Sequence, residues 1–264
     1  MSMNDETKTT KLSVRISVIS IIALSLIVIN GESFFPSANA QETMCDNLDS
    51  NIALPVLLIH GWNEGSDGDI RIHFDEWERQ LQQESIPFCT VSFQQSSDAC
   101  GSAADHAREI GQIIQNIKNT IGQNQVNIVG FSKGGLDARV YLDNSNSQDV
   151  ANLIMIGTPN DGSPVAESTN HCWPAIKDIR PGAPATMTGE NTHTQYYTIA
   201  GECLPFLVNP FGFIIIPEPN DSLVGISSVN SQPYFQFLGY STNCHLNLLG
   251  DYEYGLAHDV LIER

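Results

Sequence analysis

A serine between two glycines is the first candidate for chemistry in this sequence. Residues 130–134 read Gly-Phe-Ser-Lys-Gly, and the apolar, β-branched residues at 126–129 predict a buried strand before them. Apolar residues at helical spacing follow, so Ser132 is expected on a tight turn between a strand and a helix. Its hydroxyl would point away from the sheet, beside free N–H groups at a helix start that favour an oxyanion. The alternative interpretation is a glycine-rich turn with an incidental serine.

A histidine later in the chain is expected to act as the base for this serine. A serine hydroxyl is a weak nucleophile at neutral pH and needs a histidine that a carboxylate orients. Where the nucleophile lies on a turn between a strand and a helix, the serine comes first along the chain, the carboxylate second and the histidine third. Of the seven histidines, His245 follows an expected strand at residues 234–240 after a short loop, and we therefore choose it. His258, near the end of an expected C-terminal helix, is the alternative.

The carboxylate should lie in a loop after the strand that precedes this last one. Asp221, in the sequence Pro-Asn-Asp-Ser-Leu-Val at 219–224, fits that position. The other role for an aspartate in such a segment is that of a turn residue or helix cap. Weaker candidates for the carboxylate are Glu202, Glu218 and Asp251.

Two backbone N–H groups are expected to form the oxyanion hole. One belongs to Lys133, the residue after the nucleophile, and the other to the loop after the first strand, where we choose Trp62. The imidazole of His60 is expected to organise that loop by hydrogen bonding. We expect the Lys133 side chain to be solvated, with no role beyond its amide.

Strands and helices must alternate to hold these residues at one edge of a sheet. The pattern of apolar residues predicts helices over residues 74–81 and 102–121, the second opened by Ser102 in a capping box with Asp105. Residues 44–53 are expected to form only a polar lead-in. Alternation of this kind indicates an α/β fold with a mostly parallel sheet flanked by helices. The expected strands before the last one are 55–59, 88–93, 126–129, 153–156 and 196–200.

Two segments interrupt the alternation. Residues 160–195 are rich in Gly, Pro, Asn and Thr, and they are expected to form a loop-rich insertion over the site. Residues 204–219 are apolar and bounded by prolines. They are either an acyl-binding or lid surface, or a buried strand with its turns, because apolar runs this short are ambiguous.

The N-terminal segment has the composition of a secretory signal peptide. Basic residues precede the apolar stretch 16–29, and Ala-Asn-Ala at 38–40 resembles a cleavage site. We therefore expect a signal peptide at 1–40, a catalytic domain at 41–264 and a secreted protein. An uncleaved membrane anchor is the alternative, although 14 residues are short for a span of about 20.

The number and position of the cysteines fit an exported protein. All six follow the signal peptide, and an even number in an exported chain predicts up to three disulfides, with buried free thiols as the alternative. Connectivity cannot be deduced from spacing, and Cys89–Cys100 is our single choice because these two could clip one loop. The spacing shows no paired CxxC signature of a metal site.

The net charge indicates which classes of partner the protein is expected to repel. A formal charge of −18 should repel nucleic acid and anionic membrane surfaces, so we expect no nucleic-acid partner. An acidic chain could bind calcium, but its composition does not require it.

Several of these segments together resemble secreted bacterial-type lipases of the α/β-hydrolase superfamily. The segments are HGW after PVLLI, GFSKGGLDARVYL, IGTPNDGS, PNDSLVGISS and CHLNLL, and they run from about Pro55 to Leu249. The resemblance implies the α/β-hydrolase fold and a carboxylic ester hydrolase with Ser132, Asp221 and His245 as its triad. Phe131 and Lys133 depart from the family, which has histidine and glutamine there.

The resemblance also bears on cofactors. Larger members of that family have an aspartate two residues after the histidine as part of a calcium site. Asn247 stands at that position here, so we expect no metal and no other cofactor.

The sequence therefore predicts a secreted serine hydrolase, either a triacylglycerol lipase or a carboxylesterase. Its partner would be an ester or lipid substrate, met in transient contact with a lipid interface if the enzyme is a lipase. A thioesterase or amidase of the same fold is the alternative enzyme. A non-catalytic extracellular binding module is the alternative of a different class, because a fold alone does not prove activity.

Overall fold

The structure is a computed structural model, and it describes residues 44–49, 52–65, 68, 74–145, 147–203, 216 and 219–263. The expected signal peptide at 1–40, Glu218 and nearly all of the apolar segment 204–219 lie outside these residues. The division of the chain at residue 40 and the two interpretations of 204–219 therefore remain predictions. In the described ranges, no helix combines the length and the apolar character needed to span a membrane.

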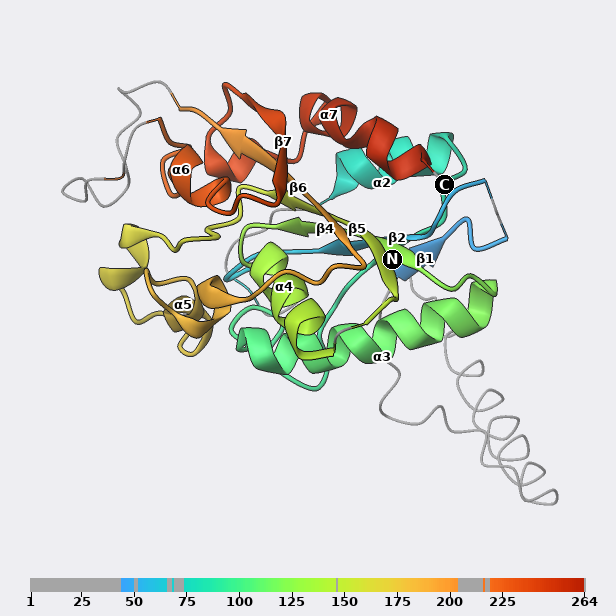
Figure 1. Cartoon of the computed structure of the whole chain (residues 1–264), viewed down its shortest axis with the longest axis horizontal. Helices are drawn as coiled ribbons and strands as arrows, with labels where there is room; N and C mark the ends of the chain where they lie inside the picture. The colour runs from blue at the N-terminus through green and yellow to red at the C-terminus, as the bar shows by residue number, and fades with distance from the viewer. Residues whose placement is uncertain are drawn as a thin grey trace, which may run out of the picture. The chain divides into compact units, whose positions relative to one another are not determined.

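A seven-stranded sheet forms the centre of the fold (Figure 1). Its strands lie in the order β1-β3-β2-β4-β5-β6-β7, and all neighbours are parallel except β1 and β3. This confirms the predicted mostly parallel sheet. The strands are β1 (Met44–Asp46), β2 (Val56–Ile59), β3 (Phe88–Thr90), β4 (Val126–Phe131), β5 (Val150–Ile156), β6 (Gln195–Gly201) and β7 (Phe235–Ser241).

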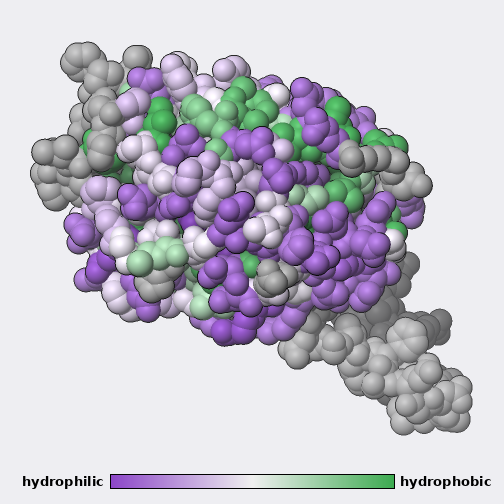
Figure 2. Space-filling view, in the orientation of Figure 1, coloured by the Kyte–Doolittle hydropathy of each residue, from purple (hydrophilic) through white to green (hydrophobic). Residues whose placement is uncertain are grey.

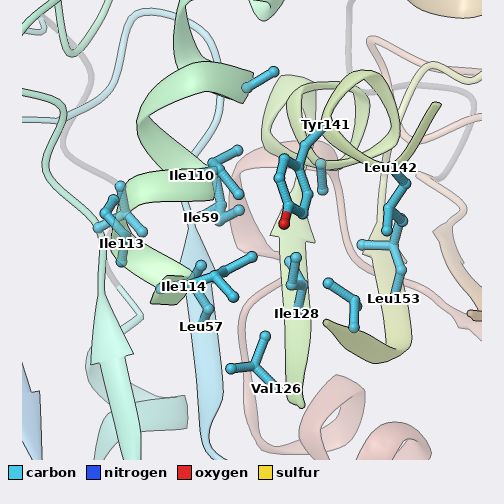
Figure 3. Close-up of a cluster of buried hydrophobic side chains, with 14 of the residues drawn as sticks. Leu57, Ile59, Ile110, Ile113, Ile114, Val126, Ile128, Tyr141, Leu142 and Leu153 are labelled. Atoms are coloured by element: carbon cyan, nitrogen blue, oxygen red, sulfur yellow. The ribbon is translucent and has the colours of Figure 1, made fainter. Parts of the chain in front are cut away.

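Helices cover both faces because the central strands are apolar on both sides. In β2, Leu57 and Ile59 join one hydrophobic cluster, whereas Val56 and Leu58 join another. The first cluster packs beneath α3 (Ala103–Ile121) and α4 (Lys133–Ser145), and Figure 3 shows its side chains between these helices and the sheet. The second packs beneath α2 (Asp75–Gln83) and α7 (Asp251–Ile262), on the opposite face (Figure 1).

Helix α3 has the boundaries that its sequence predicts. Ser102 is its N-cap, and its Oγ accepts a hydrogen bond from the Asp105 amide at 3.1 Å. The helix ends at Gly122, which has a φ of 76°. Figure 2 shows mainly hydrophilic residues over α3, as expected for a helix that turns one apolar stripe to the core and its polar side to solvent. The same view shows a group of hydrophobic residues over β7 and α7, near the edge of the sheet.

Two sequence-based expectations about strands are wrong. The lead-in contains β1, an edge strand that pairs antiparallel with β3. The expected strand 88–93 ends at Thr90, and the Phe93 amide instead donates a hydrogen bond to the Asp98 carboxylate at 2.7 Å. A side chain that accepts a backbone N–H competes with strand pairing, and nothing in local composition shows that Asp98 does so here.

The disulfides confirm the predicted number but not the predicted pairing. Cys89 is bonded to Cys45 across the β1–β3 pair, and Cys100 is bonded to Cys172. The expected Cys89–Cys100 bond is therefore wrong. The third bond joins Cys203 to Cys244, and no free thiol occurs among the cysteines described.

The insertion at 160–195 consists of short helical turns joined by loops. These are η1 (Pro164–Glu167), α5 (Ala175–Asp178) and η2 (Pro184–Met187). The Cys100–Cys172 disulfide ties this segment to the residues before α3. The last part of the chain adds α6 (Ile226–Val229) and η3 (His245–Asn247) before α7.

The order of the strands explains where a site can form. The chain leaves β2 towards α2 on one face, whereas it leaves the neighbouring strand β4 towards α4 on the opposite face. Loops that diverge in this way open a crevice at the carboxyl ends of the strands, where α/β proteins bind ligands. The loops after β2 and β4 contain Trp62 and Ser132.

Candidate active site

Ser132 occupies a strained turn between β4 and α4. Its φ is 51°, a left-handed conformation that is costly for a residue with a side chain. Its amide donates to the Ile156 carbonyl at 2.8 Å, which fixes the turn against β5. A Cβ on Gly130 would lie 2.6 Å from the Gly135 Cα, so the close approach of strand and helix requires glycine there.

His245 lies directly beside this serine. It opens η3, four residues after β7 ends, and its Nε2 is 2.9 Å from Ser132 Oγ. Its ring is 3 % exposed and lies 5.1 Å from the ring of Phe131, measured between centroids. The serine hydroxyl can donate to this nitrogen, provided that the imidazole proton resides on Nδ1.

Asp221 favours that tautomer. Its Oδ2 accepts a hydrogen bond from His245 Nδ1 at 2.7 Å, and its Oδ1 accepts from the amides of Leu223 and Val224 at 3.0 and 2.7 Å. Burial on its own would lower the pKa of His245. The charge and hydrogen bond of Asp221 outweigh it, so the pKa is raised.

The alternative residues lie elsewhere. His258 is on α7, where its Nε2 bonds to Glu84 at 2.9 Å. Asp251 is exposed at the start of the same helix, beside Arg79. The structure therefore brings together Ser132, His245 and Asp221, from three separate loops, and keeps these alternatives apart from them.

The residues chosen for the oxyanion hole flank Ser132. Lys133 begins α4, where the first N–H groups have no partner within the helix. Among the described residues, neither its amide nor that of Trp62 donates a hydrogen bond. No described residue therefore competes with a ligand for either N–H group.

His60 organises the loop that contains Trp62. Its Nδ1 lies 3.1 Å from the Gly61 carbonyl, and its Nε2 lies 2.8 Å from Asp98 Oδ1. Burial would lower the pKa of His60, but Asp98 and, to a smaller extent, Glu64 raise it above its usual value. A doubly protonated ring would donate to both oxygens, which fits the raised pKa.

The Lys133 side chain is not solvated, contrary to the sequence-based expectation. It is 1 % exposed, and its Nζ donates to Asp137 Oδ1 at 2.6 Å. Asp137 Oδ2 also bonds to His106 Nδ1 at 2.7 Å. The charges of Lys133 and His106 lower the pKa of Asp137 against the effect of burial. The spacing of four residues on a helix is the signal that could have indicated this pair.

A largely apolar pocket opens beside Ser132 and His245. Its walls come from the loop after β2, from the insertion at 160–195 and from the segment after Asp221. The lining residues are Trp62, Glu64, Ser132, Pro159, Ser163, Val165, Ala166, Ile176, Ile179, Leu223, Val224, His245 and Leu246. The insertion thus contributes the apolar wall of the candidate site.

Sequence reasoning missed Glu64, which is 2 % exposed and lines this pocket. Burial raises the pKa of Glu64 to about 7, although the Gly61 amide and the charges of His60 and His245 act in the opposite direction. A carboxyl four residues after His60 was visible in the sequence, but its burial was not.

Metal binding remains untested. Among the described residues, no three His, Cys, Asp or Glu side chains form a group that could hold a metal ion. Asn247 lies in η3, two residues after His245. The expectation that no metal or other cofactor takes part stays a prediction.

Comparisons with known proteins identify the fold. The sequence profile of the palmitoyl protein thioesterase family matches residues 55–201, more than half of the chain. The lipase BlEst2 of Bacillus licheniformis, in its mature form, superposes with a TM-score of 0.64 at 20% identity, over 80% of this chain and 93% of that one. The metagenomic carboxyl esterase MGS0156 superposes with a TM-score of 0.57 at 16% identity, over 74% of this chain and 65% of that one.

At these identities, the solved structures establish the α/β-hydrolase fold and nothing finer. They confirm the fold inferred from the sequence, and together with the family profile they confirm the resemblance to lipases and esterases of this superfamily.

Proposed function

The chain belongs to the palmitoyl protein thioesterase family of α/β-hydrolases, and from this premise we propose that it is a secreted serine hydrolase of carboxylic esters. The observation that carries the proposal is a continuous pair of hydrogen bonds. Ser132 Oγ lies 2.9 Å from His245 Nε2, and His245 Nδ1 lies 2.7 Å from Asp221 Oδ2. A hydroxyl, an imidazole and a buried carboxylate in this order are the groups that nucleophilic acyl transfer needs.

The proposed reaction has two stages. Ser132 Oγ attacks the ester carbonyl carbon while His245 Nε2 takes its proton, and the carbonyl oxygen becomes an oxyanion held by the amides of Trp62 and Lys133. The intermediate collapses as His245 returns the proton to the leaving alcohol, which leaves an acyl-enzyme. Water then attacks the acyl group by the same route, with His245 as base, and Ser132 is regenerated. Asp221 orients the imidazole and stabilises its charged form.

Covalent labelling tests the proposal. A fluorophosphonate should attach to Ser132, and Ser132→Ala should lose both the label and ester turnover. Ser145→Ala is the matched control, because Ser145 lies on the same helix but at its exposed end, and it should label normally. Undiminished turnover in Ser132→Ala would refute the proposal.

The pocket supports an apolar acyl group as substrate. Aliphatic side chains from the insertion and from the segment after Asp221 line it. Whether the enzyme is a lipase or an esterase depends on the length of chain accepted and on residues 204–219, which lie almost entirely outside the described residues. A rate that rises steeply above the solubility limit of a long-chain ester would indicate a lipase, whereas smooth saturation on short esters would indicate an esterase.

Thioester hydrolysis is a second candidate, because the family profile that matches this chain is that of a thioesterase. The same acyl-enzyme would form, with a thiol as leaving group instead of an alcohol. The kcat/KM values for an oxygen ester and a thioester with the same acyl chain would separate the two activities. An amide with that acyl chain tests the remaining alternative.

Export is supported by the cysteines. Three disulfides in one chain are typical of an oxidising compartment. We propose that residues 1–40 are removed and that residues 41–264 form the secreted catalytic domain. N-terminal sequencing of protein recovered from culture medium should then begin at Gln41.

A further inference from the structure

Glu64 is a buried carboxyl in the proposed active site that the triad does not use. Among the described residues, no salt-bridge partner lies against it. Its Oε2 accepts one hydrogen bond, from the Gly61 amide at 2.9 Å. An acid that is buried without a cation is costly, so its presence in a pocket beside a nucleophile calls for a function.

The bond to Gly61 ties Glu64 to the oxyanion loop. Gly61 immediately precedes Trp62, whose amide is a proposed oxyanion donor. A Cβ on Gly61 would lie 2.8 Å from Ser132 Cβ and 3.1 Å from Glu64 Oε1. The loop, the nucleophile and the carboxyl are therefore packed around one point, and a shift of Glu64 would move the Trp62 amide relative to Ser132.

Glu64 lines a pocket whose described walls carry few other ionisable groups. Of the lining side chains in the described part of the chain, Glu64 and His245 are the ones with an acidic or basic group. The other charged groups near Glu64 are already engaged, since His60 bonds to Asp98 and His245 bonds to Asp221. An acyl group with its own carboxylate would meet the charge of Glu64 across apolar surroundings, where repulsion is weakly screened.

We propose that Glu64 is a positioning residue for the oxyanion loop and also sets the charge preference of the pocket, which accepts neutral acyl groups and excludes anionic ones. The inference rests on the proposed function, because it concerns the same pocket. Glu64 holds the Gly61 amide through Oε2, and its negative charge repels anions in the pocket.

Two p-nitrophenyl esters of similar length test the charge preference, namely the heptanoate and the mono-ester of adipic acid. At about pH 8.5, where Glu64 is ionised, wild type should prefer the heptanoate by about 100-fold in kcat/KM, and Glu64→Gln should reduce this ratio at least tenfold. The wild-type ratio should also fall as the pH is lowered through about 7, since Glu64 then gains a proton while the adipate carboxylate, with a pKa of about 4.5, stays charged. Effects of His245 cancel in the ratio, because both esters need the same base.

Comparing Glu64→Gln with Glu64→Leu separates positioning from charge. Glu64→Gln keeps an oxygen for the Gly61 amide, so its kcat on the heptanoate should fall less than that of a variant without an acceptor. Glu64→Leu removes the acceptor for the Gly61 amide. Its kcat on the heptanoate should therefore fall by about tenfold or more, with little change in KM. Glu109→Gln is the matched control, because Glu109 is also 2 % exposed and accepts loop amides, from Gln94, Gln95 and Ser96, outside this pocket. It should leave the ratio unchanged.

The outcomes distinguish this inference from the proposed function. If Ser132→Ala is inactive but Glu64→Gln leaves the ratio and its pH dependence unchanged, the charge preference is refuted and the function stands. If Ser132→Ala turns over both esters at the wild-type rate, the proposed function falls and the inference with it. Should Glu64→Leu fail to fold, as judged by circular dichroism, Glu64→Met, which has the length of glutamine without its oxygen, takes its place, and an unchanged kcat in that variant would refute the positioning role.

Discussion

Asp221 and His245 are joined twice, once through their side chains and once through their backbones. The His245 amide donates to the Asp221 carbonyl at 2.8 Å, in addition to the bond between Nδ1 and Oδ2 at 2.7 Å. The loop after β6 and the loop after β7 are therefore held together by the same two residues that we propose as base and orienting carboxylate. The position of the imidazole is thus set before any substrate arrives.

Replacing this carboxylate by an amide should reveal its electrostatic role. In Asp221→Asn, kcat should fall by about 10³- to 10⁴-fold, because the amide can hold the wrong tautomer and no longer stabilises the imidazolium. The pKa of His245 is raised mainly by Asp221 against burial, and the base must be neutral to act. The acidic limb of the kcat/KM profile should therefore move to lower pH in the variant. An unmoved limb would show that His245 does not titrate in catalysis.

The disulfide between Cys203 and Cys244 should matter for activity as well as for stability. Cys244 immediately precedes His245, and the Cys203 amide donates to the Asn220 carbonyl at 2.8 Å, next to Asp221. Replacing both cysteines by serine should lower kcat about tenfold, because the base and its carboxylate lose a shared anchor. Turnover and urea unfolding of the purified variant measure the two effects.

The Cys45–Cys89 bond provides a control that closes a loop of similar length. The two disulfides join residues 41 and 44 positions apart, so loop-closure entropy predicts that each contributes about 4 kcal/mol. Cys45→Ser with Cys89→Ser should lower stability by a similar amount and leave kcat unchanged. Equal losses of kcat in both double variants would contradict the specific role of Cys203–Cys244.

The parts of the fold that sequence reasoning predicted depend on local pattern. The apolar strand before Ser132, the glycines around it and the capped helix α3 all follow from composition and spacing. The order of strand ends along the chain was then enough to choose Asp221 and His245, which the structure places together with Ser132.

The parts that sequence reasoning missed depend on contacts between distant residues. Cys89 bonds to Cys45 because β1 pairs with β3, and a polar lead-in gives no sign of that pairing. Lys133 was expected to be solvated, and Glu64 was not singled out, because charged residue types are usually exposed and the burial of both is set by surrounding segments. The spacing of Lys133 and Asp137 hints at their pair, but the burial of Lys133 and Glu64 follows only from the elements that pack over them.

The buried pair of Lys133 and Asp137 should be costly to break from one side. Lys133→Met leaves the Asp137 charge buried, with only His106 to compensate, and should lower the free energy of unfolding by about 3–5 kcal/mol. Lys133→Met with Asp137→Leu should recover part of that loss, because the buried carboxylate is removed together with its cation, whereas His106 Nδ1 loses its acceptor. Urea unfolding of both variants makes the comparison. A double variant no more stable than Lys133→Met would show that the pair stabilises the fold in its own right.

Glu64 should make stability depend on pH in a direction unusual for a carboxyl. Its pKa is raised by burial from 4.5 to about 7 in the folded chain, so the folded state binds this proton more tightly than the unfolded state does. The stabilisation is fully present below the unfolded pKa and is lost as the pH rises through the folded pKa. Glu64→Gln carries no such proton, so its stability relative to wild type should increase between about pH 4.5 and 8 by up to about 3 kcal/mol. Urea unfolding of both proteins across this range measures the difference, in which other titrating groups cancel to first order. A difference that stays flat with pH would mean that Glu64 is ionised as readily in the folded pocket as in water, and that the apolar walls around it do not exclude solvent.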